Sequence, residues 1–216
     1  MSLAASRPAR PRFPGVRAPK PLLAAEAESR LTPRQREVLD ALEALVVRGG
    51  FADLTMAQIA GRVNCSLRTL YEISPSKDEL VLTVVDRRLH RIGRAAIASL
   101  DASLTPLAAL RAYLQAANEA VQPTTAAFAR DFAGVPGAKR LLDAHEAYVM
   151  AVTRSLLERA RAEGEIRPVD TEAVAYVLGG LGREFSRRQV ETGGTGSAKA
   201  NADAVAEILL RGLAKD

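Results

Sequence analysis

The sequence has little of several residue types, and each shortage narrows what the protein can be. Cys65 is the only cysteine, so no disulfide can form within the chain, which favours a thiol-reducing compartment. No apolar run approaches the roughly 18 residues of a membrane span. The first 21 residues hold no apolar stretch that could act as a signal peptide. We therefore expect a cytoplasmic protein that makes no contact with a membrane.

Aromatic residues are also scarce, at 4% of the 216 residues with no tryptophan, whereas hydrophobic residues make up 48%. An interior of this composition is built mainly from Ala, Leu and Val, and Ala and Leu are among the better helix formers. No apolar alternation with a period of two, which would indicate strands, stands out. The sequence therefore predicts an all-α chain, and it shows no internal repeat.

Residue patterns that support catalysis or metal binding are missing from the sequence. His90 and His145 are the only histidines, and neither stands at a metal-ligand spacing from the other or from Cys65. GVPGAK (134–139) and GGTGSAK (193–199) faintly resemble phosphate loops, but neither fits G-x-x-x-x-G-K-[ST] nor follows a strand, so both indicate helix breaks. We predict no catalytic residue, no metal and no cofactor, and hence no enzyme.

Basic charge is concentrated at the N-terminus. The net charge is +5, and residues 1–30 hold six Lys or Arg against two Asp or Glu, while the remainder is close to neutral. Five of the eleven prolines also lie in residues 1–21. This composition predicts a disordered basic tail over residues 1–30. The tail is either solvated or an arm that enters a DNA minor groove.

Four helix starts follow between residues 31 and 80, each with a capping residue. Thr32 and Thr55 begin capping boxes, Ser66 begins a short helix, and Ser76 begins another capping box and a long helix to about residue 100. Asn64 tolerates the left-handed conformation of a tight turn. Further helices are expected over about 105–121, from after Pro123 to 132, and over about 138–163, 170–190 and 200–213.

The short helix after Ser66 is the second helix of a helix-turn-helix arrangement, whose first turn can face base edges in a major groove. Arg68 can donate two hydrogen bonds to guanine, Tyr71 can reach a phosphate, and Lys77 lies at a helix N-terminus that attracts phosphate. The predicted DNA-contacting residues are Thr55, Ser66, Leu67, Arg68, Thr69, Tyr71 and Lys77.

The stretch FADLTMAQIAGRVNCSLRTLYEISPSKDELV, residues 51–81, resembles the DNA-binding domain of the TetR family of bacterial transcriptional regulators. The resemblance implies a three-helix DNA-binding domain over 31–80, and an effector-binding and dimerisation domain over 81–216. It also implies a homodimer, an operator in double-stranded DNA, and a small molecule that releases the DNA. Where the family usually has an aromatic residue this chain has Ser74. Either Ile73 takes over its packing or the recognition helix is held less firmly.

Each of the last two expected helices carries an apolar stripe. If two copies of the chain pair these helices across a two-fold axis, the four helices would form a bundle. The alternative is a core within one chain. The candidate interface residues are Val174, Val177, Leu178, Leu181, Phe185, Val205, Ile208 and Leu209. The candidate effector-pocket residues, each also compatible with plain core, are Ile92, Ala96, Tyr113, Phe128, Phe132, His145 and Tyr148.

These observations favour a ligand-responsive repressor. A helical small-molecule-binding protein with a degenerate helix-turn-helix domain is the alternative, favoured slightly by Ser74 and by the near-neutral charge of residues 31–91. In the repressor, the helix that starts at Ser76 is expected to be the only continuous link between the DNA-binding domain and the pocket. Cys65 is either a small buried residue or a redox-sensitive thiol.

Overall fold

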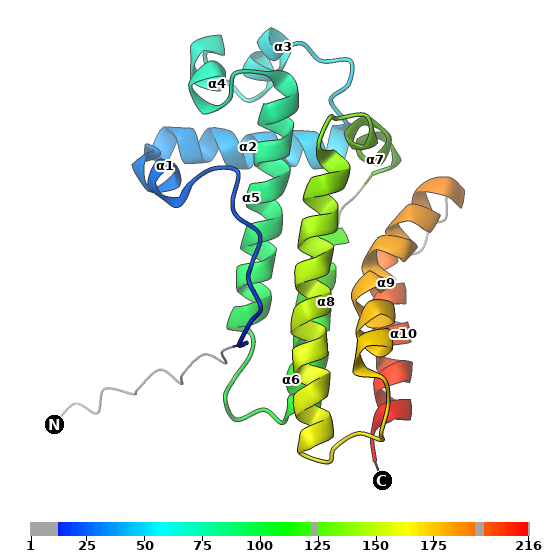
Figure 1. Cartoon of the computed structure of the whole chain (residues 1–216). Helices are drawn as coiled ribbons and strands as arrows, with labels where there is room; N and C mark the ends of the chain where they lie inside the picture. The colour runs from blue at the N-terminus through cyan, green and yellow to red at the C-terminus, as the bar shows by residue number, and fades with distance from the viewer. Residues whose placement is uncertain (1–12, 122–124, 193–196, 216) are drawn as a thin grey trace, which may run out of the picture.

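The computed structural model describes residues 13–121, 125–192 and 197–215, and in these ranges the regular structure is helical (Figure 1). The all-α prediction is confirmed. In chain order the elements are α1 (Ala25–Arg30), α2 (Pro33–Gly49), α3 (Met56–Arg62), α4 (Leu67–Ile73), α5 (Lys77–Ala98), α6 (Pro106–Ala117), the 3-10 helix η1 (Asn118–Val121), α7 (Ala126–Ala133), α8 (Ala138–Ala162), α9 (Thr171–Thr192) and α10 (Ala198–Leu213). Within the described ranges, no helix is both long and apolar enough to cross a membrane.

The helix starts lie where the capping residues predict them. Thr32 and Thr55 each form a complete capping box, and the hydroxyls of Ser66 and Ser76 accept the backbone N–H of the residue three positions later. Asn64 has a φ of 51°, the left-handed conformation expected of the turn between α3 and α4. Local side-chain contacts therefore determine where these helices start, and Asn64 accommodates the turn between α3 and α4.

A compact apolar cluster holds α2, α3, α4 and the start of α5 together. Its largest buried members are Leu39, Leu42, Ile59, Leu70 and Leu80. Ile73 packs against this cluster, and Ser74 is buried beside it as the C-cap residue of α4. The packing of Ile73 agrees with the first alternative raised by Ser74, and how firmly the recognition helix is held stays a prediction.

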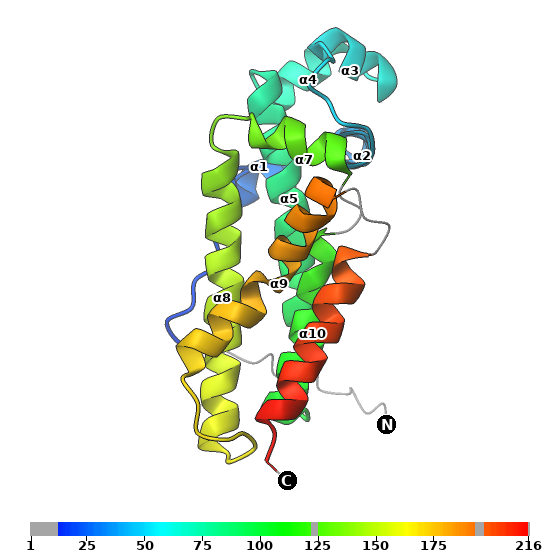
Figure 2. The ribbon, with the colours of Figure 1, turned by 90° about the vertical axis from the view of Figure 1, so that its right-hand side faces the viewer.

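The C-terminal helices form a second, larger core. Figure 1 shows α5 and α8 running along the length of the molecule, and Figure 2 shows α9 and α10 covering one side of it. Fully buried side chains of this core come from α6, α8, α9 and α10: Leu110, Tyr113, Leu156, Leu157, Leu178 and Leu210. Gly179 permits a close approach of α9 to α8, because a Cβ there would lie 3.3 Å from the Cα of Met150.

The predicted disordered tail over residues 1–30 is wrong for its C-terminal part, where Ala25–Arg30 form α1. This helix has no side-chain cap, and a long-range ion pair between Glu28 and Arg87 of α5 holds it. Such a contact leaves no local signal in the sequence. Residues 1–12, which carry three of the tail's arginines, lie outside the described residues.

Candidate DNA-binding surface and ligand cavity

The first turn of α4 presents an exposed face at one end of the molecule. Leu67 and Tyr71 are exposed, and the Arg68 side chain is 88% exposed. Thr55, Ser66 and Thr69 lie beside them, with the hydroxyls of Thr55 and Ser66 used as helix caps. The structure thus brings the seven predicted contact residues to the helix-turn-helix region, and their contact with DNA stays a prediction.

Two charged residues that the sequence analysis did not single out shape this surface. Glu72 accepts a hydrogen bond from Nε of Arg68 at 2.9 Å, one helical turn along α4. Arg34 of α2 donates from Nη2 to the carbonyl oxygen of Asn64 at 2.6 Å, and so bonds the turn between α3 and α4. The four-residue spacing of Arg68 and Glu72 is a signal that could have found their pair. Arg34 and Asn64 are too distant in sequence for such a signal.

Lys77, at the start of α5, bonds the loop before α3. Its Nζ donates to the carbonyl oxygens of Ala52 and Leu54, at 2.7 and 3.2 Å. An ammonium group has three N–H donors, so one remains for a phosphate. Lys77 therefore holds the loop before α3 whether or not it also contacts DNA.

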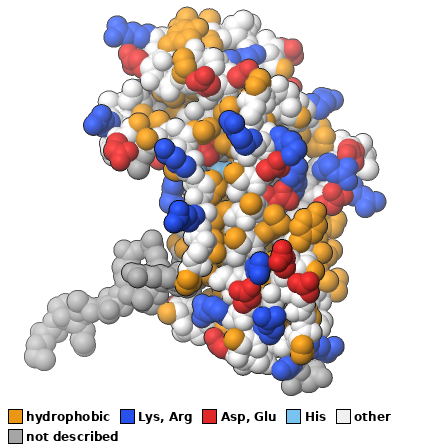
Figure 3. All heavy atoms as spheres, in the orientation of Figure 1, with side chains coloured by type: hydrophobic (Ala, Val, Ile, Leu, Met, Phe, Trp, Pro, Cys, Tyr) orange, Lys and Arg blue, Asp and Glu red, His pale blue; other side chains and the backbone are white. Residues whose placement is uncertain are grey.

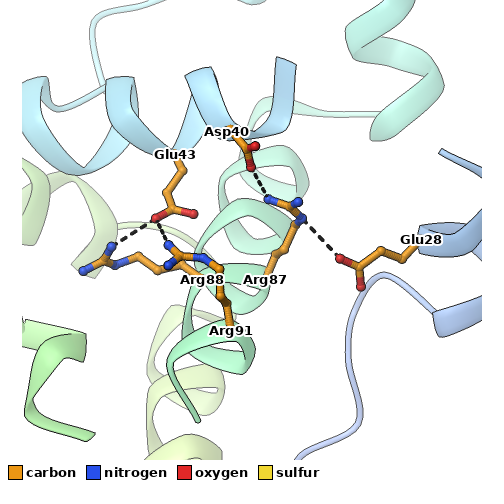
Figure 4. Close-up of polar contacts among 6 residues, drawn as sticks. All are labelled: Glu28, Asp40, Glu43, Arg87, Arg88 and Arg91. Atoms are coloured by element: carbon orange, nitrogen blue, oxygen red, sulfur yellow. Dashed lines mark hydrogen bonds and ion pairs between the residues drawn. The ribbon is translucent and has the colours of Figure 1, made fainter. Parts of the chain in front are cut away.

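Ion pairs join α5 to α1 and α2. Figure 4 shows the six residues involved: Glu28, Asp40, Glu43, Arg87, Arg88 and Arg91. Arg87 donates to both Glu28 and Asp40, and its side chain is mostly buried. Partly buried pairs of this kind are screened less by salt than surface pairs. A movement of α5 should therefore carry α1 and α2 with it.

A cavity of about 710 Å³ lies among α5, α6, α7, α8 and α9. This volume is typical of sites for small organic molecules. Six of the seven predicted pocket residues line it: Ile92, Tyr113, Phe128, Phe132, His145 and Tyr148. Tyr113 is almost wholly buried, and burial raises the pKa of its hydroxyl well above the ordinary value, so the group stays neutral.

The prediction of Ala96 as a pocket residue is wrong. Ala96 is fully buried and packs in the core of the C-terminal helices, away from the cavity. The helical spacing correctly placed it on an inner face of α5. Spacing does not distinguish the part of that face that meets other helices from the part that meets a cavity. Gly93, one turn earlier, lines the cavity instead.

The cavity wall is largely apolar, with polar groups on α8 and α9 and further ones on α5, η1 and α7. Arg183 of α9 donates hydrogen bonds to Asp143 and Glu146 of α8, so its charge is already matched by acidic partners. Asn118 and Ser186 add neutral polar groups to the lining. This wall suits a mainly apolar molecule with a few hydrogen-bonding groups.

The helix α7 connects the cavity to the helix-turn-helix region. Phe128 and Phe132 stack on the cavity side with ring centroids 5.3 Å apart. Between them in sequence, Asp131 accepts the backbone N–H groups of Phe51 and Ala52 through Oδ2, at 2.6 and 2.8 Å. The expectation that α5 is the only link is therefore wrong. No sequence pattern predicts this second link, because Asp131 and Phe51 are 80 residues apart.

The predicted dimer residues differ widely in their exposure in the single chain. Leu178 is wholly buried in the chain's own core, so its prediction as an interface residue is wrong. Val174, Leu181 and Leu209 also pack against that core, while Phe185 and Val205 are half-buried. Val177 and Ile208 are 48% and 69% exposed, and Tyr176, which the sequence analysis missed, is 72% exposed. On α9 the predicted set therefore mixes one exposed residue, Val177, with residues that face the chain's own core.

Large exposed apolar side chains lie on three parts of the described chain. They are Leu22 before α1, Leu67 and Tyr71 on α4, and Tyr176, Val177 and Ile208 on α9 and α10. Figure 3 shows hydrophobic side chains on the right-hand side of the molecule, over α9, and others at the upper end, over α3 and α4. We call Tyr176, Val177 and Ile208 the α9/α10 face.

Comparison with curated proteins finds two groups of regulators, while no protein-family model matches the chain. The chain is 32% identical over 89 residues to the HTH-type transcriptional repressor KstR of Mycobacterium tuberculosis; the match covers 41% of this chain and 40% of KstR. It is 30% identical over 161 residues to the HTH-type transcriptional regulator BetI of Brucella melitensis, covering 68% of this chain and 81% of BetI. The chain thus spans less than half of the KstR length but most of the BetI length.

Solved structures with the same fold include a TetR transcription regulator from Haloarcula marismortui, with a TM-score of 0.70 at 19% identity over 86% of this chain and 100% of that chain. A transcriptional regulator from Saccharomonospora viridis, solved in complex with choline, has a TM-score of 0.67 at 18% identity over 84% of this chain and 98% of that chain. At these identities the similarity shows the fold alone.

Proposed function

We propose that this chain, which belongs to the TetR family of transcriptional regulators, binds an operator as a homodimer and releases it when a small molecule fills the cavity. The relatives named above are regulators, in agreement with the prediction that the chain is not an enzyme. The effector that best suits the cavity wall is a mainly apolar organic molecule.

The observation that carries this proposal is the position of α7. One side of the helix contributes Phe128 and Phe132 to the cavity, and the carboxylate between them bonds the backbone just after α2. A ligand that binds one position of α7 better than another will shift the population of that position, and the bonded loop before α3 will follow. In this proposal the cavity is the ligand site, the helix-turn-helix region binds DNA, and α7 connects the two.

DNA recognition in this proposal uses the first turn of α4. Arg68 reads a base, Tyr71 and Lys77 position the phosphate backbone, and Thr55, Ser66, Leu67 and Thr69 contact the groove or its edge. The Arg68 guanidinium is exposed and bonded to Glu72 by Nε alone, which leaves its two terminal nitrogens to face a guanine.

Dimerisation in this proposal uses the α9/α10 face. Tyr176, Val177 and Ile208 are large apolar side chains in water in the single chain, and the two helices lie next to one another (Figure 2). Packing two copies of this face together would bury them in a four-helix bundle.

The test is selection of bound duplexes from a random-sequence pool, followed by titration of the selected duplex and of a scrambled duplex of equal length at several salt concentrations. We expect a two-fold symmetric site bound at least about 10³-fold more tightly than the scrambled duplex. If the two duplexes bind alike, the chain is not a sequence-specific regulator, and the ligand-binding alternative with a degenerate helix-turn-helix domain replaces it.

A further inference from the structure

Three metal-ligating side chains that are scattered in the sequence meet between α5 and α8. Asp86 and His90 lie one turn apart on α5, and His145 comes from α8. Nε2 of His145 lies 3.0 Å from Oδ1 of Asp86, and Nε2 of His90 lies 3.5 Å from the same oxygen. A ligand atom from each of the three residues lies within 4.8 Å of the other two.

The cluster is almost closed to solvent. The Asp86 side chain is 3% exposed, and those of His90 and His145 are 11% and 13% exposed. Oδ2 of Asp86 accepts the backbone N–H of Leu22 at 2.8 Å, so Oδ1 is the oxygen that faces both imidazoles. Asp86 therefore accepts one hydrogen bond through each carboxylate oxygen, from Leu22 at Oδ2 and from the His145 ring at Oδ1.

One ring nitrogen of His90 lacks a hydrogen-bond partner in this arrangement. Within the described part of the chain, its Nε2 is buried and has no hydrogen-bond partner. A buried ring nitrogen without a partner costs free energy and needs a physical explanation. A cation between this nitrogen and the charged carboxylate would satisfy both.

We propose that Asp86, His90 and His145 form a binding site for a divalent transition-metal ion of the zinc class. Zn–N and Zn–O bonds of about 2.0–2.1 Å in tetrahedral geometry place neighbouring ligand atoms about 3.3–3.4 Å apart. The observed separations of 3.0 and 3.5 Å bracket this value. The ligand atoms of His90 and His145 lie within 4.8 Å of each other, so the two imidazoles would move toward each other where that separation exceeds the tetrahedral value.

The choice of metal follows from the donors. Two imidazole nitrogens and one carboxylate oxygen suit zinc, cobalt or nickel, whereas calcium and magnesium take six or more oxygens or retain several waters. The Leu22 N–H holds the carboxylate in orientation from the opposite side, as outer partners do in metal sites. Three protein ligands leave a fourth position for a water molecule or a ligand atom.

The site lies between two cavities. His145 and Tyr148 line both the large cavity and a smaller one, which is also lined by His90 and by Ala18 and Pro19 of the segment before α1. A bound ion would join α5 to α8 where the large cavity begins. The metal site rests on the three side chains themselves and stands independently of the proposed DNA binding.

The experiment titrates cobalt(II) alone, and then zinc(II) in competition, into full-length protein without a histidine tag. We expect one cobalt per chain with the strong visible absorption of a tetrahedral site, and displacement by zinc. His90→Leu should weaken binding by more than the roughly 10–100-fold that loss of an outer partner costs. Asp143→Asn, a carboxylate on α8 two residues from His145, is the matched control and should bind like wild type.

His90→Leu also separates a metal role from a structural one. His90 Nε2 makes no hydrogen bond that the substitution could break, but the ring packs edge to face against His145 with centroids 4.8 Å apart, so the unfolding temperature of the metal-free variant serves as its own reference. Zinc should raise the unfolding temperature of wild type and Asp143→Asn but not that of His90→Leu. Absence of saturable binding in wild type, or binding that survives His90→Leu unchanged, would overturn the proposal.

Discussion

Arg68 stands in the exposed first turn of α4, with Nε bonded to Glu72 and the rest of the guanidinium in solvent. A bidentate contact to guanine distinguishes it from other bases by about 1–3 kcal/mol. Arg68→Ala should therefore lose this amount on the selected duplex and relax preference at one base pair of each half-site. Competition titrations with duplexes that vary at each position measure both effects.

Arg211→Ala on α10 serves as the control for Arg68, because this arginine is exposed, paired with an acidic residue and far from α4. It should leave affinity unchanged. An equal loss by Arg68→Ala on all duplexes would make Arg68 a phosphate contact rather than a base reader.

Single residues also show which features sequence patterns predict well. Thr32, Thr55, Ser66 and Asn64 act on backbone groups within a few residues, so their roles as caps and turn are visible in the sequence and confirmed. His145 is different, because its partner Asp86 comes from another helix and the pair exists only once α5 packs against α8. The spacing of these residues along the chain therefore did not predict a metal site.

At the scale of elements, α7 should control how firmly the loop after α2 is held. Asp131→Ala removes a charged acceptor from the N–H groups of Phe51 and Ala52, and Phe51 is buried. Hydrogen bonds to charged groups contribute about 1.5–3 kcal/mol, so the free energy of unfolding should fall by roughly this amount. Denaturant unfolding monitored by circular dichroism measures the change.

Asp53→Ala is the matched control for Asp131, since Asp53 is an exposed carboxylate in the same loop. Its effect should stay within about 0.5 kcal/mol. If Asp131→Ala is equally mild, the bonds from α7 do not stabilise the loop and α7 is not the connection between the cavity and the helix-turn-helix region.

The elements also explain which helices could be predicted. α2 to α5 carry strong capping signals and apolar periodicity, so their starts were predicted within a residue. α1 has only six residues and no side-chain cap, and its ion pair to Arg87 is long-range. The proline-rich sequence before it therefore led to a prediction of disorder instead of a helix. On α9, Val174, Leu178 and Leu181 of the predicted stripe are apolar because they face the chain's own core, whereas Val177 of the same stripe is exposed beside Tyr176.

At the scale of the whole molecule, Ile208 tests the dimer. It is 69% exposed in the single chain, so Ile208→Glu should leave the monomer folded while placing a costly unpaired charge in an interface formed by the α9/α10 face. Sedimentation should show monomers with wild-type helicity. Leu22→Glu, another exposed apolar position outside this face, should remain dimeric. A dimeric Ile208→Glu protein would place the interface elsewhere.

Filling the cavity from α5 tests how the whole dimer responds to a ligand. Gly93 lines the cavity, and a Cβ added there would meet no atom within 4 Å, so Gly93→Phe can extend a ring into the space without moving the backbone. The half-sites of an operator are set by the helical repeat of DNA, about 34 Å per turn, so a small change in the separation of two recognition helices prevents both from docking.

Gly93→Phe should therefore act as a permanently bound ligand, lowering affinity for the selected duplex by at least tenfold while leaving the protein dimeric. Fluorescence anisotropy with labelled duplex measures the affinity, and sedimentation the dimer. Gly93→Ala, which adds only the Cβ, should keep DNA affinity and gain about 0.5–1 kcal/mol of stability from the better helix former. Full DNA affinity in a folded Gly93→Phe dimer would mean that occupation of this cavity does not control the helix-turn-helix region, because a ring there would then have no preference between the two arrangements.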